Sequence, residues 1–262
     1  MEATSISSSR PASEPLGDPV EEARRVVAVA TGKALLARVL GGAAVQLQAP
    51  DASPLLPRAV KDIDLATPRG ARTAVTDALI SAGYTPDRMF NALHGAKRLL
   101  FYDGKNGRKL DVFVGGFSMC HEVPIADRLE REPLTVPLAE LLLTKLQIVQ
   151  LTERDQRDIY SLTFHHALSD GDGSGIEADF IADLCARDWG LWRTTKSTVE
   201  RCIASVIDYG LEGDVADLIA GRLAALWARI DAEPKSAKWR LRSRVGDRMR
   251  WYNEPEETGA EN

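Results

Sequence analysis

Lys61-Asp62-Ile63-Asp64-Leu65 is a short segment in which two carboxylates alternate with apolar residues. Apolar and β-branched residues around the charges favour a short buried strand. Because successive side chains on a strand alternate between its faces, Asp62 and Asp64 should share one face while their apolar neighbours pack on the other. A second segment, Leu110-Asp111-Val112-Phe113-Val114, places Asp111 opposite its apolar face. The two segments are predicted to be strands that present three carboxylates on one side.

Three carboxylates that meet on one side of a sheet repel one another strongly unless a cation lies between them. Their oxygens are hard ligands, which suit Mg²⁺, with Mn²⁺ as an alternative. We therefore expect Asp62, Asp64 and Asp111 to form a divalent-metal site for phosphate chemistry. The competing interpretation is that Asp62 or Asp64 caps a turn or pairs with an arginine.

The overall composition is that of an ordinary globular protein, with 262 residues, 44% hydrophobic residues and 27% charged residues. A net charge of −5 argues against a strongly basic nucleic-acid coat protein but leaves room for a local basic patch. The three cysteines lack Cys-x-x-Cys spacing, which favours a reducing compartment and argues against structural zinc. The apolar stretch at residues 26–40 is interrupted by polar residues, and the chain does not open with a secretory leader pattern. We therefore expect a cytoplasmic protein with no membrane partner.

Changes in composition along the chain predict four regions. Residues 1–19 are rich in Ser, Pro and Glu with little to bury, so a disordered tail is expected. Residues 20–136 mix strand and helix patterns, which predicts an α/β core. Helical periodicity dominates residues 137–250, which predicts a helical domain, and residues 251–262 are expected to form a second tail.

A candidate phosphate site precedes the first carboxylate strand. The apolar run at residues 35–40 enters Gly41-Gly42, and a helix is expected to follow. Glycine lets backbone N–H groups approach a phosphate closely, and a helix N-terminus carries partial positive charge. A tight turn without a ligand is the alternative interpretation of the two glycines.

The remaining segments of the α/β core bring the chain back to the first carboxylate strand. Residues 51–57 contain two prolines and a serine and are predicted to be a loop. Residues 69–83 have apolar positions at helical spacing and end in glycine, which predicts a helix. Residues 89–102 and 108–113 are predicted to form a hairpin that turns on residues 103–107. This arrangement leaves room for the second carboxylate strand to lie beside the first.

In the helical region, one helix is predicted to begin near Pro137, because apolar residues recur at helical spacing. Lys145 lies on the apolar stripe of this helix, where a lysine must extend to water or meet an anion. A second helix carries Asp155, Arg157 and Asp158. Lys145 and Asp158 are therefore candidate partners, either in a structural ion pair or in a functional site.

The rest of the helical region offers weaker signals. Residues 169–175 imitate the start of a calcium-binding loop, but Ile181 stands where a bidentate glutamate is needed, so a flexible loop is favoured. The four histidines lack ligand-like spacing and are treated as ordinary polar residues. A basic run at residues 235–250 is either a solvated face or a patch for a tRNA-like partner, with Trp239 and Trp251 as stacking surfaces.

The order of these motifs resembles a known superfamily. A Gly-Gly turn, an Asp-x-Asp strand and a third Asp on a neighbouring strand resemble the nucleotidyltransferase superfamily of the DNA polymerase β type. Residues 141–147 and 154–160 look like the "K-L … R … R-D" signature of abortive-infection and toxin-type nucleotidyltransferases. Many members have Gly-Ser where this chain has Gly41-Gly42, and often an acidic residue where it has Ser161. The resemblance covers roughly residues 35–162.

The resemblance implies an α+β fold in which a nucleotidyltransferase-type mixed sheet is flanked by helices and followed by a C-terminal helical domain. It implies a metal-dependent transferase that moves a nucleoside monophosphate from an NTP, ATP included, to an acceptor on RNA, such as a tRNA, or on protein. Such an enzyme could be the toxin of a toxin–antitoxin pair, with a protein antitoxin as partner. The alternatives are a nucleotidyltransferase for a small molecule of the aminoglycoside type, and a catalytically inactive nucleotide-binding module.

The resemblance also implies roles for the carboxylates. Two metal ions about 3.5–4 Å apart neutralise the attacking and leaving oxygens in this kind of transfer. Asp62 and Asp64 would hold the ion that bridges the triphosphate. Asp111 would complete the second metal site and draw the proton from the acceptor hydroxyl.

Nucleotide binding is implied for a second group of residues. Backbone N–H groups of Gly41 and Gly42 would cradle phosphates. Lys145 would offset the charge of the triphosphate or of pyrophosphate, and Asp158 would orient Lys145.

Overall fold

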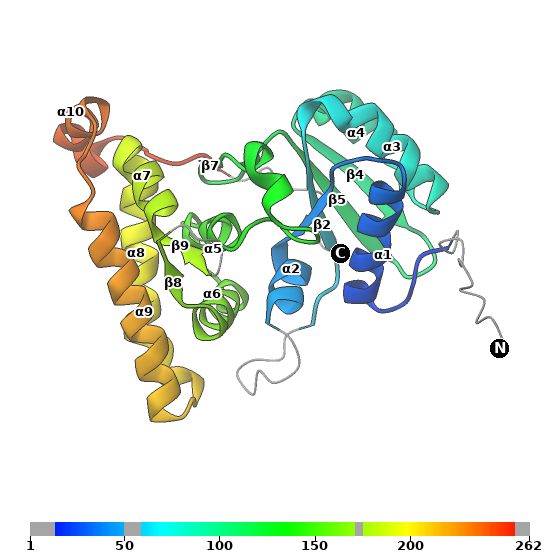
Figure 1. Ribbon diagram of the computed structural model, residues 1–262. Coiled ribbons are helices and arrows are strands. Elements are labelled where there is room, and N and C mark those ends of the chain that lie inside the picture. Colours follow the sequence, from blue (N-terminus) through cyan, green and yellow to red (C-terminus); the bar gives the residue numbers. More distant parts are fainter. Residues whose placement is uncertain (1–13, 50–58, 171–174, 255–262) are drawn as a thin grey trace, which may run out of the picture.

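The computed structural model describes residues 14–49, 59–170 and 175–254, whose arrangement is shown in Figure 1. One half of the molecule contains a five-stranded sheet with helices packed on it, and the other half is built mainly from helices. The predicted α+β class, with a mixed sheet flanked by helices, is therefore confirmed. No helix in these three ranges is long and apolar enough to cross a membrane.

The sheet combines parallel and antiparallel pairs. Its strands are β1 (Arg38–Leu40), β2 (Ile63–Thr67), β3 (Thr85–Pro86), β4 (Arg98–Asp103) and β5 (Arg108–Val114). They lie in the order β1-β2-β5-β4-β3, in which β2 and β5 are parallel and every other neighbouring pair is antiparallel. A parallel pair needs a long connection, and the segment between β2 and β5 supplies it. The two carboxylate strands are thus direct neighbours, as the sequence predicts.

The first carboxylate strand, β2, begins two residues later than the strand predicted at residues 61–65. Ile63 and Leu65 are fully buried and Asp64 between them is partly exposed, so the predicted alternation holds. The strand continues to Thr67, which is buried and donates a hydrogen bond to a backbone carbonyl at 2.8 Å. Because that hydroxyl is satisfied, a polar residue extends the strand at its far end. At the other end, the strand begins at Ile63, so Asp62 lies just outside it and is exposed.

The hairpin predicted around residues 103–107 is present between β4 and β5. Asp103 holds the turn, because its carboxylate accepts hydrogen bonds from the backbone N–H groups of Lys105 and Asn106, each at 3.1 Å. The buried guanidinium of Arg108 donates to the same carboxylate at 2.7 Å. This local network fixes the register of β4 against β5.

A helix, α4 (Arg88–His94), replaces the first part of the strand predicted at residues 89–102. Asp87 precedes it, and its carboxylate accepts a hydrogen bond from the Phe90 N–H at 2.9 Å. A capped helix start of this kind satisfies a backbone donor that would otherwise lack a partner. The strand prediction is wrong for this part, because the cap at Asp87 begins a helix.

Three further helices pack around the sheet: α1 (Pro19–Gly32), α2 (Gly41–Gln48) and α3 (Arg72–Ser81). Asp18 caps α1 by accepting hydrogen bonds from the first two free N–H groups, both at 2.9 Å. α1 packs against both α2 and α3. The helix predicted at residues 69–83 is confirmed as α3, which follows a short 3-10 turn, Arg69–Ala71.

The other half of the molecule begins at the predicted helix start, because Pro137 is the N-cap of α5. Its helices are α5 (Leu138–Leu146), α6 (Glu153–His165), α7 (Ala178–Arg187), α8 (Trp189–Ser205), α9 (Gly213–Ala232) and α10 (Ala237–Val245). Two short strand pairs lie outside the five-stranded sheet: β6 (Phe117–Ser118) with β7 (Glu122–Val123), which precede Pro137, and β8 (Leu168–Ser169) with β9 (Ile176–Glu177), which lie between α6 and α7. The other 3-10 segments are Ala126–Arg131, Val206–Tyr209 and Gly246–Arg248.

The hydrophobic core runs without a break from the sheet half into the helical half. Leu65 of β2, Leu142 of α5 and Ile219 of α9 are fully buried members of this one cluster. The boundary predicted between residues 136 and 137 therefore coincides with the beginning of α5 but not with a gap in the core.

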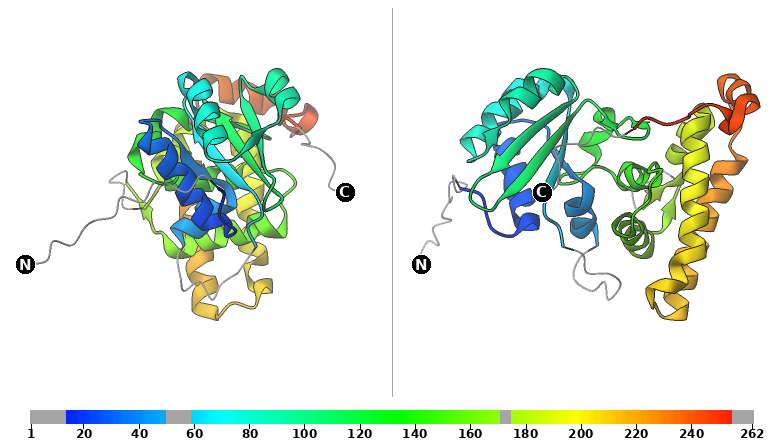
Figure 2. Two further views of the ribbon diagram at one scale, coloured as in Figure 1. Left: turned by 90° about the vertical axis from the view of Figure 1, so that its right-hand side faces the viewer. Right: turned by 180° about the vertical axis from the view of Figure 1, so that it is seen from behind.

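Parts of both predicted tails pack against the fold. At one end, the Leu16 carbonyl accepts a hydrogen bond from Arg108 at 2.7 Å. At the other end, the chain returns from α10 toward β7 (Figures 1 and 2), and the Asn253 N–H donates to the Cys120 carbonyl at 2.9 Å. Four predicted segments lie wholly or partly outside the described residues: the tail ends 1–13 and 255–262, the loop at 51–57, and residues 171–174 of the calcium-like segment.

Candidate functional site

The centre of the candidate site is a pair of carboxylates on neighbouring parallel strands. Asp64 of β2 and Asp111 of β5 are direct register partners, so their side chains leave the same face of the sheet. Asp111 is buried, and Asp64 is partly exposed. On its other side Asp64 pairs with Leu40, the last residue of β1 before the two glycines. The sheet therefore brings two of the three predicted carboxylates and the predicted glycine turn together.

Burial and neighbouring charges raise the pKa of both carboxylates. Burial, followed by the charge of Asp111, raises the pKa of Asp64 to about 7, against the opposing effects of Lys145 and Arg98. Burial also raises the pKa of Asp111 above its ordinary value, although the hydrogen bond from Arg98 opposes the shift. Two neighbouring acids with raised pKa values form a site that gains stability when a cation approaches. Their oxygens are the donor type that Mg²⁺ and Mn²⁺ prefer.

Gly41 packs directly against the Asp64 carboxylate. Its φ is +68°, and a Cβ at this position would overlap Asp64 Oδ2. Both the left-handed backbone and the close approach require glycine here. The predicted strand, Gly-Gly turn and helix are confirmed as β1, Gly41-Gly42 and α2. The turn thus places the first N–H groups of α2 next to the carboxylate pair.

Asp62 takes a different position from the one predicted. It is exposed, and its Oδ1 accepts a hydrogen bond from the Lys109 N–H at 3.1 Å. Its charge still contributes to the raised pKa values of Asp64 and Asp111. Within the part of the chain that the structure describes, no three His, Cys, Asp or Glu side chains form a group that could hold a metal ion. Asp64 and Asp111 therefore lie together as a pair, while Asp62 is bound to the Lys109 N–H outside that pair.

Arg98 is a site residue that the sequence analysis missed. Its Nε donates to Asp111 Oδ1 at 2.8 Å, and its guanidinium lies 5.2 Å from the ring centroid of Phe113 and 5.9 Å from that of Phe90. The hairpin register contains the signal that could have found it. Leu100 pairs with Asp111, so Arg98, two residues earlier on β4, lies on the same face and is a diagonal neighbour.

Lys145 links the carboxylate pair to the helical half. Its Nζ lies 2.8 Å from Asp158 Oδ2 and 3.2 Å from Asp155 Oδ1, and the three side chains are largely buried. The predicted proximity of Lys145 and Asp158 is therefore present. Asp155 was not predicted as a partner of Lys145; it also closes a capping box with Thr152 at the start of α6. Because the charge of Lys145 also lowers the pKa of Asp64, the lysine lies within electrostatic reach of the sheet carboxylate.

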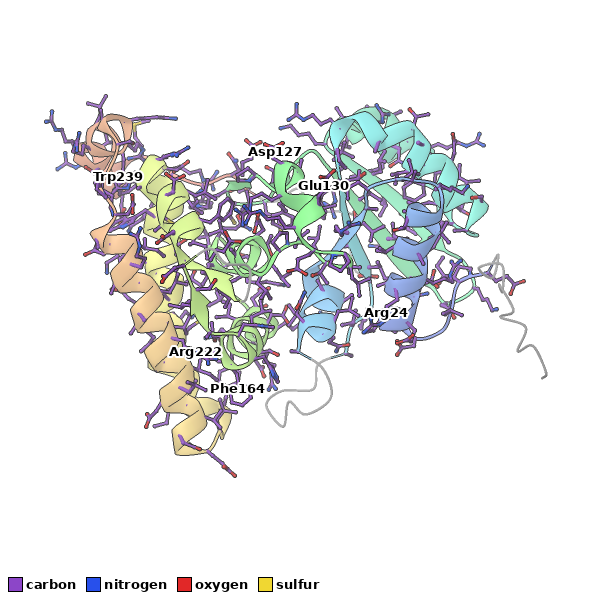
Figure 3. The ribbon with its side chains drawn as sticks, in the orientation of Figure 1. Arg24, Asp127, Glu130, Phe164, Arg222 and Trp239 are labelled. Atoms are coloured by element: carbon purple, nitrogen blue, oxygen red, sulfur yellow. The ribbon has the colours of Figure 1, made fainter. Side chains whose placement is uncertain are left out.

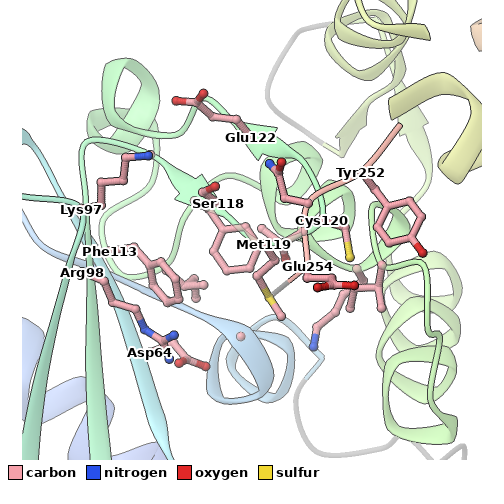
Figure 4. Close-up of a pocket in the computed structure, with 18 of the residues that line it drawn as sticks. Asp64, Lys97, Arg98, Phe113, Ser118, Met119, Cys120, Glu122, Tyr252 and Glu254 are labelled. Carbon is pink, nitrogen blue, oxygen red and sulfur yellow. The ribbon is translucent and has the colours of Figure 1, made fainter. Parts of the chain in front are cut away.

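A cleft of about 1330 Å³ lies between the sheet half and the helical half, and Gly41, Asp64, Arg98 and Lys145 are among the residues that line it. Figure 4 shows Asp64 and Arg98 on the sheet side of the cleft and Tyr252 on the opposite side. Phe113, Phe117 and Met119 add an apolar wall. Its charged lining includes the cations Arg69, Lys97, Arg98 and Lys145 and the anions Asp64, Glu122, Asp155 and Glu254.

The tryptophans proposed as stacking surfaces for RNA are partly buried and pack within the protein. The Trp239 ring packs against Trp192 with ring centroids 5.2 Å apart, and Figure 3 shows Trp239 at the α10 end of the molecule. Trp251 packs against Trp189 at 6.1 Å and donates a hydrogen bond to Thr194 at 3.1 Å. Packing within the protein therefore accounts for both tryptophans. Stacking on a nucleobase would require an open ring face.

Part of the basic run also has internal partners. Arg242 donates to the Gly246 carbonyl at 2.8 Å and to the Met249 carbonyl at 2.7 Å, and Lys235 donates to the Ile230 carbonyl at 2.6 Å. These side chains satisfy carbonyl groups at and beyond the helix ends. Two of the histidines are likewise held by hydrogen bonds, to Thr194 and to the Gln48 carbonyl.

No protein-family model matches this sequence, and no curated protein matches it significantly. The geometry of the carboxylate pair and of the cleft beside it is therefore the basis for inferring a function.

Proposed function

We propose that this protein is a Mg²⁺-dependent nucleotidyltransferase that moves a nucleoside monophosphate from an NTP to a hydroxyl on RNA or protein. One observation carries the proposal: Asp64 and Asp111 stand side by side on parallel strands, and Asp64 lines a cleft together with Gly41 of the glycine turn and Lys145. A carboxylate pair, a glycine-bearing helix start and a lysine are the groups that an NTP and its metal ion require.

The carboxylate pair fits a divalent metal ion. The raised pKa of Asp64 reflects burial and an acid neighbour, and a divalent ion held by Asp64 and Asp111 would remove that repulsion. When bound, such an ion supplies charge neutralisation for the attacking and leaving oxygens of phosphoryl transfer. Asp62 Oδ1 accepts the Lys109 N–H, so Oδ2 is the oxygen that Asp62 would offer as a further ligand.

The chain's own groups then have defined tasks. The acceptor oxygen forms a bond to the α-phosphorus, the bond from that phosphorus to the bridging oxygen breaks, and pyrophosphate leaves. The acceptor proton passes to an oxygen of Asp111. Backbone N–H groups of Gly41 and Gly42 hold phosphate oxygens at the start of α2, and Lys145, oriented by Asp158, balances the charge of the departing pyrophosphate.

The size of the cleft supports a two-substrate reaction. Pockets for a single small ligand measure about 300–1,000 Å³, and this cleft is larger, at about 1330 Å³. It leaves room for the end of an acceptor beside an NTP. A growth-inhibiting toxin with an antitoxin partner would use such a reaction on RNA or protein, and a small aminoglycoside-type acceptor would occupy the same space.

Incubation of the purified protein with each α-labelled NTP, Mg²⁺ and total cell extract tests the proposal. Label should appear in RNA or in a protein band, whereas label in a small-molecule fraction would assign the alternative acceptor class. Asp64→Ala should abolish incorporation while the variant stays folded, which a retained cooperative thermal unfolding transition would check. Nucleotide binding without pyrophosphate release, or full activity of Asp64→Ala, would overturn the proposed enzyme.

A further inference from the structure

We propose that Arg98 is a positioning residue that takes the place of the metal ion on Asp111 and moves to the triphosphate when the ion binds. This inference rests on the proposed nucleotidyltransferase function. The new element is that one side chain, Arg98, couples the binding of metal to the binding of nucleotide.

The contacts of Arg98 indicate its first position. Arg98 Nε donates to Asp111 Oδ1 at 2.8 Å, and only 8% of the Asp111 side chain is exposed. A carboxylate buried to this extent needs a counter-charge, because isolated charges are costly to remove from water. Arg98 supplies that charge from the neighbouring strand β4. The oxygen it occupies is one of the two that Asp111 can offer to a metal ion.

Arg98 and a divalent ion compete for the Asp111 carboxylate, and the ion has the greater charge. A divalent ion attracts Asp64 and Asp111 together with twice the charge of a guanidinium, and it repels the guanidinium that shares Asp111. Arg98 itself is 21% exposed and lines the cleft, so it has open space into which it can turn. The ion is therefore expected to displace Arg98 from Asp111 Oδ1.

The surroundings of Arg98 indicate its second position. The rings of Phe113 and Phe90 flank the guanidinium, at 5.2 Å and 5.9 Å from their centroids. Aromatic neighbours favour a guanidinium plane without fixing its hydrogen-bond partner. A released Arg98 would thus stay at the cleft, where its planar fork suits the oxygens of a phosphate group. The metal ion alone has to break the Arg98–Asp111 pair, whereas metal and NTP together replace that pair by a contact to phosphate.

Titration of the purified full chain with Mn²⁺ alone, followed by the electron paramagnetic resonance of the free ion, tests this coupling. Arg98→Met should bind Mn²⁺ about tenfold more tightly than wild type, since its competitor for Asp111 is gone. At saturating Mn²⁺, the same variant should bind a non-hydrolysable NTP analogue about tenfold more weakly. A purely structural Arg98 would give no gain in metal affinity.

Two further variants make the result specific. Lys97→Met removes a neighbouring cleft cation, whereas the ion pair of Asp111 is with Arg98, so the Mn²⁺ affinity of this variant should change by less than about twofold. Arg98→Lys keeps the charge but loses the planar fork, and it substitutes for Arg98→Met if that variant unfolds. It should bind Mn²⁺ like wild type and the NTP analogue more weakly.

The outcomes separate this inference from the proposed function. Equal Mn²⁺ affinity of wild type and a folded Arg98→Met would overturn the role of Arg98 and leave the transferase proposal standing. Failure of wild type and both Arg98 variants to bind Mn²⁺, with or without nucleotide, would overturn the metal site itself. Opposite shifts in metal and nucleotide affinity would support the coupling.

Discussion

Asp64 is the residue at which stability and the proposed chemistry make opposite demands. Its carboxylate is placed beside Asp111 and against Gly41, and its pKa rises to about 7 through burial first and the Asp111 charge second. The folded protein therefore retains a proton near neutral pH that the unfolded chain has released. An arrangement that weakens the apo protein in this way is a common property of functional sites.

Asp64→Asn should stabilise the protein at alkaline pH. Because the folded-state pKa lies above the ordinary carboxyl value, wild-type stability falls as pH rises from about 4 through about 7, and asparagine does not titrate. The variant should be more stable by about 1–3 kcal/mol near pH 8 and equally stable near pH 4. Urea unfolding at both pH values measures the difference. Added Mg²⁺ should stabilise wild type only, and equal stability near pH 8 would contradict the raised pKa.

Gly41→Ala should damage the site more than an equivalent glycine substitution elsewhere. Gly41 and Gly107 both have positive φ, +68° and +63°, so alanine should cost about 1–2 kcal/mol at either position. A Cβ on Gly41 would overlap Asp64, whereas a Cβ on Gly107 would meet open space. We therefore expect Gly41→Ala to lose Mn²⁺ binding and nucleotide transfer, and Gly107→Ala to keep both. Equal metal affinity in the two variants would show that the contact with Asp64 does not matter.

The sequence was sufficient to predict that Asp64 and Asp111 lie on the same face of the sheet, because the alternation of side chains along a strand depends only on neighbouring residues. Asp62 differed because the strand begins at Ile63, and a backbone N–H on β5 was available to its carboxylate. Arg98 was missed because its partner is set by the hairpin register and not by its own neighbours in sequence. Counting the register outward from the Asp103–Arg108 turn would have placed it beside Asp111.

At the scale of elements, helical spacing was the reliable signal and short apolar runs were not. The repeat after Pro137 correctly predicted α5, and the apolar positions after Arg69 predicted α3. The first part of the strand predicted at residues 89–102 is a helix instead, because the N-cap at Asp87 begins one there. The packing of α5 against α6 then placed Lys145 beside Asp155 and Asp158, which no single element could have shown.

Lys145→Ala, compared with the double variant Lys145→Ala/Asp158→Asn, separates a structural ion pair from a role in catalysis. The single change removes the cation between two largely buried carboxylates and should lower stability by about 2–4 kcal/mol. Neutralising Asp158 as well should recover most of that loss. If Lys145 acts on the triphosphate, the double variant stays impaired in NTP use, with KM raised or kcat lowered. Recovery of both stability and activity would establish a purely structural pair.

At the scale of the whole molecule, the two halves are held together by more than the loop between them. One hydrophobic core runs through both, and the C-terminal residues cross back over the cleft. Trp251 is anchored on α8 by Thr194 and by Arg193, whose guanidinium lies 5.5 Å from its ring centroid. Two residues later, the Asn253 N–H meets the Cys120 carbonyl in the sheet half. The sequence could not reveal this crossing, because the contacts join residues far apart in the chain.

Truncation at two points tests whether this crossing matters. A chain that ends at Arg250 loses Trp251, with its partly buried indole, and the Asn253–Cys120 hydrogen bond, so its free energy of unfolding should fall by about 2–4 kcal/mol. A chain that ends at Glu254 keeps every one of these contacts and serves as the matched control, with stability equal to wild type. Because Tyr252 and Glu254 line the cleft, the shorter chain should also bind an NTP analogue with altered affinity while keeping its Mn²⁺ affinity. Guanidinium unfolding and analogue titration measure both effects, and identical behaviour of the two truncated chains would show that the C-terminal segment neither joins the halves nor shapes the site.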